Sequence, residues 1–357
     1  MTKSFSERLL SWFDQHGRHD LPWQHPRSPY RVWLAEIMLQ QTQVATVIPY
    51  YQRFLDHFPD LSSLAAATTD AVLAQWAGLG YYSRARNLHK AAQVCCSTHH
   101  GTLPNDQEQL EALPGIGRST AAAIRAQAYG ERAAILDGNV KRVLARYHGI
   151  DQWPGLTQVQ RELWLLAEEH TPEARVTDYT QAIMDLGASV CRRSRPSCDQ
   201  CPLSEDCQAR IQGRQSELPA RAPKRSRPIR HAVLLWAVDA QGRSLLERRP
   251  PSGIWGGLWS LPELPASDAA AARAIDPQPW CENSGLKLCQ TQTLPSFHHD
   301  FSHYRVHLYP LRLCVAEGSR AADSSSRWCD LQSLAALGLP SPIHKLLQAN
   351  PTADAFS

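Results

Sequence analysis

The sequence has no apolar run long enough to cross a bilayer, and its first residues lack the apolar core of a signal peptide. We therefore expect a cytoplasmic protein with no membrane partner. The sequence also lacks a large excess of either charge, since 37 Lys and Arg against 34 Asp and Glu give a net charge of +3. By itself this small positive balance is only weak support for a nucleic-acid partner. The 357 residues, 43% of them hydrophobic, are enough for about two domains, each with its own core.

Four of the ten cysteines lie close together, and their pattern indicates a metal centre. In a reducing compartment such a group binds metal rather than forming disulfides. The spacing is C-x6-C-x2-C-x5-C, and four thiolates suit either a tetrahedral zinc ion or an iron-sulfur cluster. The spacing alone leaves both possibilities open. The expected ligands are Cys191, Cys198, Cys201 and Cys207.

The loop between the first two of these cysteines is strongly basic, because it contains Arg192, Arg193 and Arg195. A cationic loop that is held at both ends by metal ligands suits contact with DNA phosphates better than electron transfer. We therefore expect the metal centre to have a structural role.

Residues 105–129 contain two glycines in the run Leu-Pro-Gly-Ile-Gly, between two stretches with helical patterns. Glycine lets the backbone turn tightly and approach another surface, and the next helix offers free amide donors to an anion. A helix, a glycine hairpin and a second helix can hold a DNA phosphate without reading the base sequence. The alternative is a plain connection between two helices. The candidate contact residues are Leu113, Gly115, Gly117, Arg118 and Ser119.

Two carboxyl groups are candidates for catalysis. Glu36 shares a helical face with Val32, Trp33 and Leu39 in a helix expected from Tyr30 to about Gln43. Burial would let Glu36 keep its proton near neutral pH and act as a general acid. The alternative is a glutamate at the edge of an amphipathic stripe. Asp137 precedes a helical stretch over residues 140–147, and its alternative is an ordinary helix N-cap.

Polar and aromatic residues elsewhere in this half are suited to DNA. The run after Glu36 turns from apolar to amide and hydroxyl side chains, which can bond base edges or fill the gap left by a displaced base. Tyr81 follows a glycine turn and precedes Arg84 and Arg86, and such mixtures wedge between bases while neutralising phosphates. Simple packing is the alternative for the tyrosine. The candidate DNA contacts are Leu39, Gln40, Gln41, Thr42 and Tyr81.

The composition changes after residue 212. Residues 213–229 are rich in proline and basic side chains, as in an extended linker. Beyond it, residues 232–238 and 304–315 alternate as strands do, and residues 342–348 have the pattern of a closing helix. We expect a second domain of the α+β class over residues 230–350.

Several motifs together resemble the helix-hairpin-helix glycosylases of DNA repair, and in particular their adenine-specific branch, the MutY family. These motifs are Leu-Gln-Gln-Thr-Gln, Gly-Leu-Gly-Tyr-Tyr, the glycine hairpin, Leu-Asp-Gly-Asn-Val-Lys, the four cysteines, Trp-Gly-Gly-Leu and Phe-Ser-His. The resemblance implies a multidomain protein, with an all-α glycosylase domain over residues 1–212 that carries a 4Fe-4S loop at 191–207. A Nudix-like domain that recognises 8-oxoguanine would follow at 230–350.

The resemblance also implies an activity, base excision repair of double-stranded DNA in which adenine opposite 8-oxoguanine or guanine is removed. Glu36 would protonate the extruded adenine, Asp137 would stabilise the oxocarbenium-like sugar, and Asn139 would orient water. The other residues that the resemblance implicates are Lys141 at the DNA, Trp23 and Gln181 in the adenine pocket, and Phe301, Ser302 and His303 at the lesion. One 4Fe-4S cluster is the expected cofactor, and we expect a monomer.

Two other hypotheses remain open at this point. Endonuclease III, a strand-cutting relative, has a lysine nucleophile where this chain has Ser119, which implies a glycosylase without strong lyase chemistry. A pyrimidine glycosylase of that type is therefore opposed by Ser119 and by the second domain. A non-catalytic iron-sulfur sensor of DNA damage would not need Glu36 or Asp137.

The second domain contains two further patterns that could bind metal. Residues 250–263 resemble the segment before the catalytic box of a Nudix hydrolase, but the helix expected over 266–275 has no glutamate to hold a divalent cation. We therefore expect the fold without the hydrolysis. His299, His303 and His307 would converge on a metal only in a helix, whereas the alternation through residues 305–308 favours a strand.

Overall fold

The computed structural model describes residues 3–223, 226–251, 253–301, 303–316, 325–330 and 332–350. Contacts between residues divide the chain into two units. One, here called the helical unit, contains residues 1–66 and 87–224, and the other, the sheet unit, contains residues 67–86 and 225–357. No helix in the described ranges is long and apolar enough to cross a membrane.

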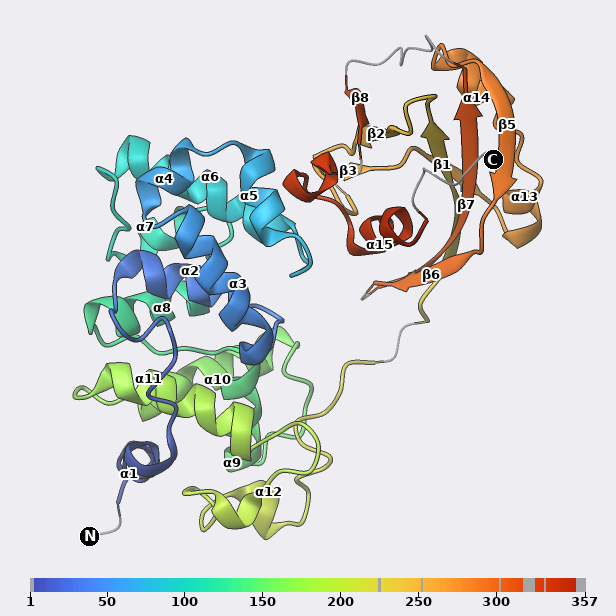
Figure 1. Ribbon diagram of the computed structural model, residues 1–357. Helices are drawn as coiled ribbons and strands as arrows, with labels where there is room; N and C mark the ends of the chain where they lie inside the picture. Colours follow the sequence, from blue (N-terminus) through green and yellow to red (C-terminus); the bar gives the residue numbers. More distant parts are fainter. Residues whose placement is uncertain are drawn as a thin grey trace. The chain divides into compact units, whose positions relative to one another are not determined.

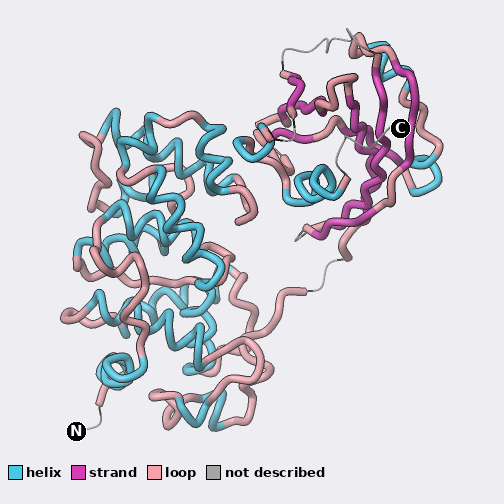
Figure 2. The backbone as a smooth tube through the Cα atoms, in the orientation of Figure 1, coloured by secondary structure: helices cyan, strands magenta, loops and turns pink. Residues whose placement is uncertain are grey.

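The helical unit consists of short helices joined by loops (Figures 1 and 2). Local capping fixes where several of them start. Ser4 and Glu7 form a reciprocal capping box at the first helix, and Asp106 caps the helix that leads into the glycine hairpin. The helices are α1 (Phe5–His16), α2 (Pro29–Leu39), α3 (Val44–His57), α4 (Leu61–Ala66), α6 (Ser83–Thr98, from Asn87 onward), α7 (Gln107–Ala112), α8 (Arg118–Ile124), α9 (Gly138–His148), α10 (Thr157–His170), α11 (Val176–Asp185) and α12 (Gln208–Ile211).

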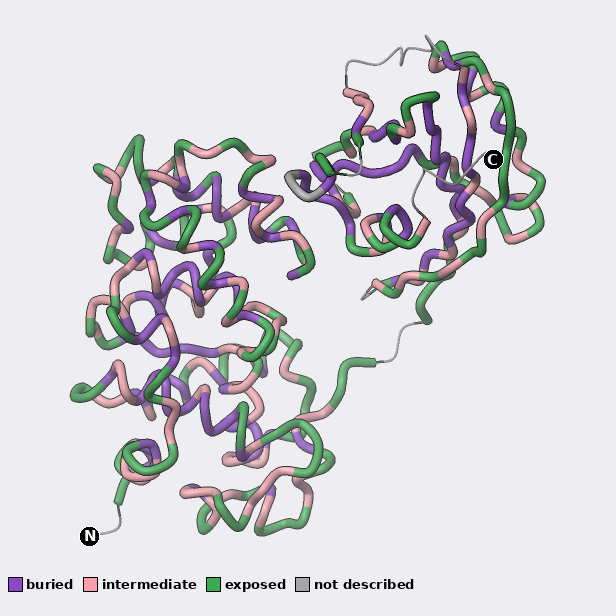
Figure 3. Tube along the Cα trace, viewed as in Figure 1, coloured by how far each residue is buried: buried purple, intermediate pink, exposed green. Residues whose placement is uncertain are grey.

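The core of the helical unit forms where α1, α9, α10 and α11 bury their apolar faces, drawn in purple in Figure 3. Leu9, Leu144, Leu163 and Leu186 are fully buried there. Removal of this much apolar surface from water holds the helices together more strongly than their individual propensities do. The start of α9, which carries Asp137 as its N-cap, is therefore fixed on a well-packed helix.

Two helical expectations need correction. The helix expected to reach Gln43 ends at Leu39, because the backbone of Gln41 has φ 58°, in the left-handed region that an α-helix excludes. The single helical region expected from Asp60 to Trp76 is two helices, α4 and α5 (Thr69–Trp76), and the side chain of Thr68 caps the second.

The helix after the hairpin changes its hydrogen-bonding pattern in its last part. The expected run to Tyr129 is confirmed, but α8 ends at Ile124 and continues as a π-helical turn, η1 (Arg125–Tyr129). Gly130, with φ 69°, ends this turn in the left-handed conformation. A second π turn, η2 (Leu186–Val190), extends α11 in the same way. Such turns contain more residues than regular helix and are frequent at functional sites.

The sheet unit is built on a mixed sheet of eight strands, in the order β3-β2-β1-β7-β5, with β4, β6 and β8 paired beside this path. Its two longest strands, β1 and β7, run parallel, and the other pairs are antiparallel. The predicted α+β class is confirmed. The strands are β1 (Ile229–Val238), β2 (Ser244–Arg248), β3 (Trp259–Ser260), β4 (Glu263–Ala266), β5 (Leu288–Thr293), β6 (Phe297–Asp300), β7 (Arg305–Val315) and β8 (Ser326–Cys329).

Alternation along β1 gives the sheet two apolar faces. Leu234 and Trp236 pack with α15 (Ser341–Ala349) on one face, and Val233 and Leu235 pack with α13 (Ala269–Arg273) and α14 (Gln278–Asn283) on the other. The helix expected over 266–275 is thus only α13, because Asp268 caps it and Ala266 belongs to β4.

Residues 67–86 contact the rest of the sheet unit through specific bonds. The Tyr82 hydroxyl donates to the Leu339 carbonyl at 3.3 Å, and the Arg248 guanidinium donates to the Asp70 carboxylate at 2.7 Å. Arg86 donates to the carbonyl of Gly256. These bonds connect α5 and the glycine turn after it to the strands and loops of this unit.

Candidate active site

One cavity of about 870 Å³ in the helical unit brings together the expected catalytic and base-pocket residues and several of the expected DNA contacts. Its wall comes from the end of α2, the start of α8, the start of α9 and α11, which are far apart in sequence. The predicted residues that line it are Trp23, Glu36, Leu39, Gln40, Gln41, Thr42, Ser119, Asp137, Asn139 and Gln181.

Glu36 lies in the last turns of α2 and lines the cavity. The residues on either side of it in the helix, Ala35 and Ile37, are buried. The Gln127 amide donates to its Oε1 at 3.0 Å. Burial and the nearby charge of Asp137 raise the pKa of Glu36 to about 7, and the bond from Gln127 opposes this rise. The expectation of a desolvated carboxyl with a raised pKa is confirmed.

Asp137 is the N-cap of α9, and its carboxylate accepts several bonds. The backbone amides of Asn139 and Val140 donate to Oδ1 at 2.9 and 2.8 Å, and the Asn139 side chain donates to Oδ2 at 3.2 Å. Burial raises the pKa of Asp137, while these bonds and the Arg142 guanidinium lower it. Asp137 is therefore an N-cap, as the alternative interpretation expected, and it also lines the cavity.

The two carboxyls differ in which protonation state their surroundings favour. Asp137 accepts three N–H bonds and lies near a guanidinium, whereas Glu36 accepts one amide bond. The three bonds and the guanidinium therefore favour the ionised form at Asp137 more than the single amide bond does at Glu36.

Asn139 is held from behind by Arg142. The Arg142 guanidinium donates to Asn139 Oδ1 at 2.7 Å and to the Gly187 carbonyl at 2.6 Å, and its Nε donates to the Cys191 carbonyl at 2.7 Å. Gly187 allows this close packing, because a Cβ there would lie 2.6 Å from Asn139 Cβ. Arg142, which the sequence did not single out for a role, thus connects the start of α9 to the cysteine loop.

Trp23 and Gln181 lie on the cavity wall as expected for a base pocket, with a network behind them that the sequence interpretation missed in part. Trp23 is 3% exposed and meets the edge of Tyr51. Gln181 Nε2 donates to Asp185 Oδ1 at 2.7 Å, and its Oε1 is buried without a hydrogen-bond partner among the described residues. Arg18 donates through its Nε and Nη2 to the same carboxylate at 2.9 and 2.5 Å. Gln181 and Asp185 are spaced i,i+4 on α11, so their neighbourhood can be recognised from the sequence. Arg18 lies in an irregular segment whose sequence shows no periodicity, so its pairing with Asp185 cannot be recognised in this way.

The hairpin between α7 and α8 has the expected shape. Gly115 has φ 82°, and a Cβ there would lie 2.8 Å from Asn87 Cβ, whereas Gly117 has open space on that side. Leu113 is 2% exposed, so its side chain belongs to the core and only its backbone can contribute to a contact. Ser119 Oγ accepts from the backbone amide of Leu136 at 3.0 Å, which fixes the residue before Asp137.

Arg118 and the glutamine run make contacts within the helical unit. The Arg118 guanidinium lies 3.8 Å from the centre of the Trp164 ring and 3.7 Å from Glu168. Gln40 donates to Thr120 at 3.4 Å, and Gln41 is exposed. The bond between Gln40 and Thr120 joins the end of α2 to α8, the helix of the hairpin.

Tyr81 belongs to the sheet unit and is 48% exposed, with φ 49°. The Arg84 guanidinium lies 5.3 Å from its ring and donates to the carbonyls of Leu79 and Gly80. Arg84 therefore holds the backbone of the glycine turn, while the Tyr81 side chain remains partly exposed to solvent, as a residue that wedges between bases needs to be.

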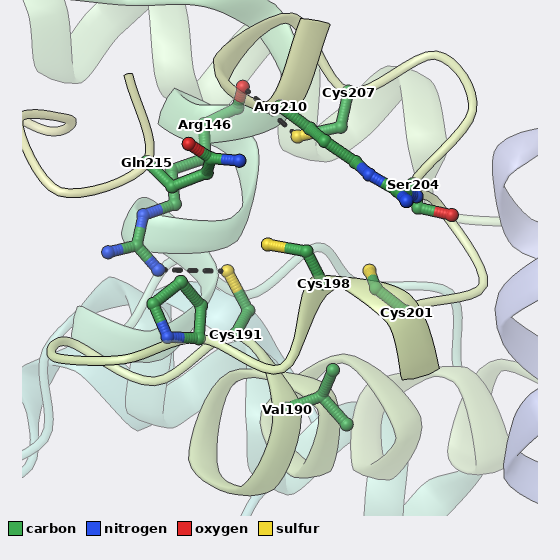
Figure 4. Close-up of a pocket in the computed structure, with 10 residues that line it drawn as sticks. Arg146, Val190, Cys191, Cys198, Cys201, Ser204, Cys207, Arg210 and Gln215 are labelled. Carbon is green, nitrogen blue, oxygen red and sulfur yellow. Dashed lines mark hydrogen bonds between the residues drawn. The ribbon is translucent and has the colours of Figure 1, made fainter. Parts of the chain in front are cut away.

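The four clustered cysteines border one small pocket, which Figure 4 shows together with Arg146 and Arg210. Among the described residues, no group of three or more His, Cys, Asp or Glu side chains converges tightly enough to hold a single metal ion. Thiolates on one zinc ion lie close together, since each Zn–S bond is about 2.3 Å. Four soft sulfur donors around one pocket are a donor set that suits either zinc or an iron-sulfur cluster.

Arg146 on α9 holds the basic loop of this motif. Its Nη1 donates to the Arg192 carbonyl at 2.7 Å and to Cys191 Sγ at 3.3 Å, and its Nε donates to the Leu218 carbonyl at 2.8 Å. Arg146 is 3% exposed, whereas Arg192, Arg193 and Arg195 are exposed residues. Lys141 lies half-buried in the first turn of the same helix.

The sheet unit has its own cavity of about 260 Å³, lined by Phe301, Tyr304, Trp255, Arg230 and Arg249. The ring of Phe301 stacks on Tyr304 at 4.8 Å and lies 5.4 Å from Trp255. His303 is exposed, and Ser302 lies outside the described residues. His299 is in β6 and His307 in β7, so the expected strand is confirmed and these histidines do not share a helix.

The family models match both parts of the chain. Residues 34–169 match the HhH-GPD superfamily of base excision DNA repair proteins, and residues 233–349 match the NUDIX domain. The adenine DNA glycosylase of Buchnera aphidicola (subsp. Baizongia pistaciae) is 34% identical over 97% of this chain and 96% of its own length. The chain belongs to the adenine DNA glycosylases. The mouse adenine DNA glycosylase is 37% identical over 91% of this chain and 73% of its own length.

The fold of the helical part agrees with solved relatives of this glycosylase. A thermostable thymine-DNA glycosylase aligns with a TM-score of 0.54 and 29% identity over 58% of this chain and 95% of that one. The expected all-α helix-hairpin-helix part, followed by a Nudix-like part, is thereby confirmed. The glycosylase is an enzyme of base excision repair that hydrolyses an N-glycosidic bond in DNA.

Proposed function

We propose that this glycosylase removes adenine that is mispaired with 8-oxoguanine or guanine in double-stranded DNA, with Glu36 as general acid and Asp137 as the carboxylate that stabilises the sugar. The observation that carries this proposal is that two carboxyls line one cavity, and that Asp137 accepts three hydrogen bonds whereas Glu36 accepts one. Glycosidases use the same division between a protonated and an ionised carboxyl.

Adenine has to leave the base stack before a side chain can reach its glycosidic bond, and a cavity of about 870 Å³ has room for it. Trp23 offers an apolar wall, and Gln181 Oε1, buried without a described partner, can accept from the amino group of the base. Asp185 and Arg18 hold Gln181 in that orientation. A site that hydrogen-bonds the base in this way discriminates by leaving its own polar atoms unpaired with a wrong base.

In the reaction, the O–H bond of Glu36 breaks and an N–H bond forms on the five-membered ring of adenine. The glycosidic electron pair then leaves with the protonated base, and positive charge develops on the sugar. Asp137 lies ionised in the same cavity and stabilises that charge. Asn139, held by Arg142, orients a water molecule whose oxygen bonds to the sugar carbon, and the proton that this water loses passes to the Glu36 carboxylate, which restores the acid.

The DNA duplex is held by backbone contacts at several places. The hairpin glycines Gly115 and Gly117 and the free amides of α8 suit a phosphate, and Arg192, Arg193 and Arg195 present exposed charge. Ser119 lines the cavity, and Lys141 lies half-buried in the first turn of α9. Gln40, Gln41 and Thr42 fill the gap left by adenine, and Tyr81 wedges into the stack.

Lesion recognition is assigned to Phe301, Ser302 and His303 of the sheet unit. The exposed imidazole of His303 and the aromatic ring of Phe301, at the mouth of its own cavity, suit contact with the damaged base. The glycosylase works as a monomer in this proposal.

The cofactor is proposed to be one 4Fe-4S cluster on Cys191, Cys198, Cys201 and Cys207. When bound, the cluster would supply cross-links between loop segments rather than redox chemistry in the reaction. Arg146 donates to Cys191 Sγ and would partly neutralise the cluster's negative charge. The four ligands would keep the arginines of the loop in place for phosphates.

The test uses purified protein, wild type and Glu36→Gln, with duplexes that carry adenine opposite 8-oxoguanine, adenine opposite guanine, or thymine glycol. After incubation, hot alkali converts abasic sites into strand breaks. Breaks at adenine with the wild type and none with Glu36→Gln would support the proposal, and Met184→Leu controls for a change at the cavity wall that keeps the acid.

Two results would contradict it. Breaks at thymine glycol alone would make the protein a pyrimidine glycosylase of the endonuclease III type. Tight binding of the mismatch without any break would point to a damage sensor.

A further inference from the structure

Gln127 is a buried polar residue behind the acid, outside the cavity itself. It is 3% exposed, lies in the π turn η1 and donates from Nε2 to Glu36 Oε1 at 3.0 Å. Glu36 lines the cavity and Gln127 does not, so the amide reaches the carboxyl from the protein side.

This bond determines which oxygen of Glu36 carries the acidic proton. Oε1 accepts the amide hydrogen, and the carbonyl oxygen of a carboxylic acid is a better acceptor than its hydroxyl oxygen, so the bond is strongest when Oε1 is the carbonyl oxygen. The proton of the neutral acid is therefore held on Oε2. We propose that Gln127 is a positioning residue that fixes the Glu36 proton on Oε2, so that it is presented to the base in the cavity.

The same bond favours the product of proton transfer. When the Oε2–H bond breaks and the proton moves to a ring nitrogen of adenine, the electron pair stays on the carboxylate. The Gln127 amide then donates to an ionised acceptor, and such bonds are stronger than those to neutral groups. Gln127 thus affects both which oxygen of Glu36 carries the proton and how readily Glu36 gives it up. This inference rests on the proposed role of Glu36.

Few charged groups surround the carboxyl. Asp137, at the start of α9, acts on it electrostatically. Arg18 lines the same cavity but is paired with Asp185, and Arg125 of the π turn is paired with Glu131 at 2.8 Å. Loss of the amide is therefore expected to appear in the titration of Glu36 itself.

The backbone around Gln127 is fixed independently of Glu36. The Thr177 hydroxyl donates to the Ala126 carbonyl at 2.7 Å, and the Tyr129 hydroxyl donates to the Leu103 carbonyl at 2.6 Å. Both bonds hold the π turn against neighbouring segments. A side-chain change at position 127 should leave the turn in place.

The test compares Gln127→Met, which keeps the length of the side chain without the donor, with Tyr129→Phe, which removes one hydrogen bond from the same turn. Single-turnover excision of adenine is measured from pH 5 to 9 with both variants and the wild type. For Gln127→Met we expect an excision rate about tenfold lower at acidic pH. We also expect the fall of the rate at high pH to occur about half to one pH unit higher than in the wild type, because the Glu36 carboxylate loses a hydrogen-bond donor. Tyr129→Phe should keep the wild-type limb.

A defect in packing alone would lower the rate at every pH without moving the limb. Coincident limbs for Gln127→Met and the wild type would therefore overturn the inference, whatever the absolute rate. Gln127→Leu serves as the second variant if Gln127→Met fails to fold, which circular dichroism checks. Excision by Glu36→Gln at the wild-type rate would instead remove the acid itself, and with it both proposals.

Discussion

Replacement of Asp185 by Asn should both destabilise the helical unit and disturb the base pocket. The Asp185 side chain is 2% exposed and accepts from the Arg18 side chain, the Arg18 backbone amide at 2.8 Å and Gln181. Asparagine keeps the shape but removes the charge, so Arg18 would remain in the pocket wall without a counter-charge. Gln181 would also lose its strongest acceptor.

The magnitude follows from how deeply the pair is buried. Removal of one partner from a fully buried pair costs about 3–5 kcal/mol, but the Arg18 side chain is 33% exposed and can recover some hydration. We expect a loss of about 2–3 kcal/mol, which for a unit of this size lowers the melting midpoint by about 5–10 °C. The single-turnover rate of adenine excision should fall at least about tenfold, because Gln181 is no longer held in place.

Asp14→Asn is the matched control. Asp14 also pairs with an arginine, Arg175, but the two side chains are 49% and 45% exposed, and Arg175 keeps a second partner in Asp178. Exposed pairs of this kind contribute little, so the midpoint should move by no more than about 1 °C. Scanning calorimetry and a stopped-time excision assay measure both effects. A midpoint for Asp185→Asn within about 1 °C of the wild type would refute the reasoning.

Three further predictions concern the acid, the hairpin and the cysteine loop. Because the pKa of Glu36 is raised to about 7 and its protonated form is the active one, single-turnover excision should be fastest below that pH and fall as pH rises through it; a flat profile from pH 5 to 9 would contradict this. Gly115→Ala should lower the melting midpoint, since φ is 82° and its Cβ would lie 2.8 Å from Asn87 Cβ, whereas Gly117→Ala should keep the midpoint and weaken DNA binding in a filter or anisotropy assay. Arg146→Met removes the bonds to the carbonyls of Arg192 and Leu218, so the basic loop should loosen; DNA affinity and iron content per protein should both fall several-fold, and unchanged values of both would speak against this role.

The parts of the site that could be predicted from the sequence are those with a local pattern. Glu36 stands out because a charged residue interrupts an apolar helical face, and Asp137 because it precedes a helix start. The hairpin is visible through its glycines, one of which has positive φ. In each case the signal extends over a few residues and reflects a backbone requirement.

Asp185 could be read from its spacing to Gln181 on α11, but the long-range partners of the supporting residues could not be predicted, because they lie far away in the chain. Arg18 and Asp185 are separated by 167 positions, and Gln127 and Glu36 by 91. A glutamine in an alanine-rich helix reads as an ordinary surface residue until the packing of α2 against η1 is known. The early end of α2 was also unreadable, since glutamine at position 41 gives no sign of its left-handed backbone.

The π turn η1 makes the spacing between the hairpin and the acid sensitive to the number of residues in between. A π turn accommodates extra chain length within a helix, and each residue of a regular helix rotates the next side chain by about 100°. Deletion of Ala128 would let the turn relax into regular helix, while deletion of Ala126 would also carry Gln127 around the axis and away from Glu36. The length of the helix between Arg118 and Gly130 is therefore constrained by the need to align the Gln127 amide with the Glu36 carboxyl.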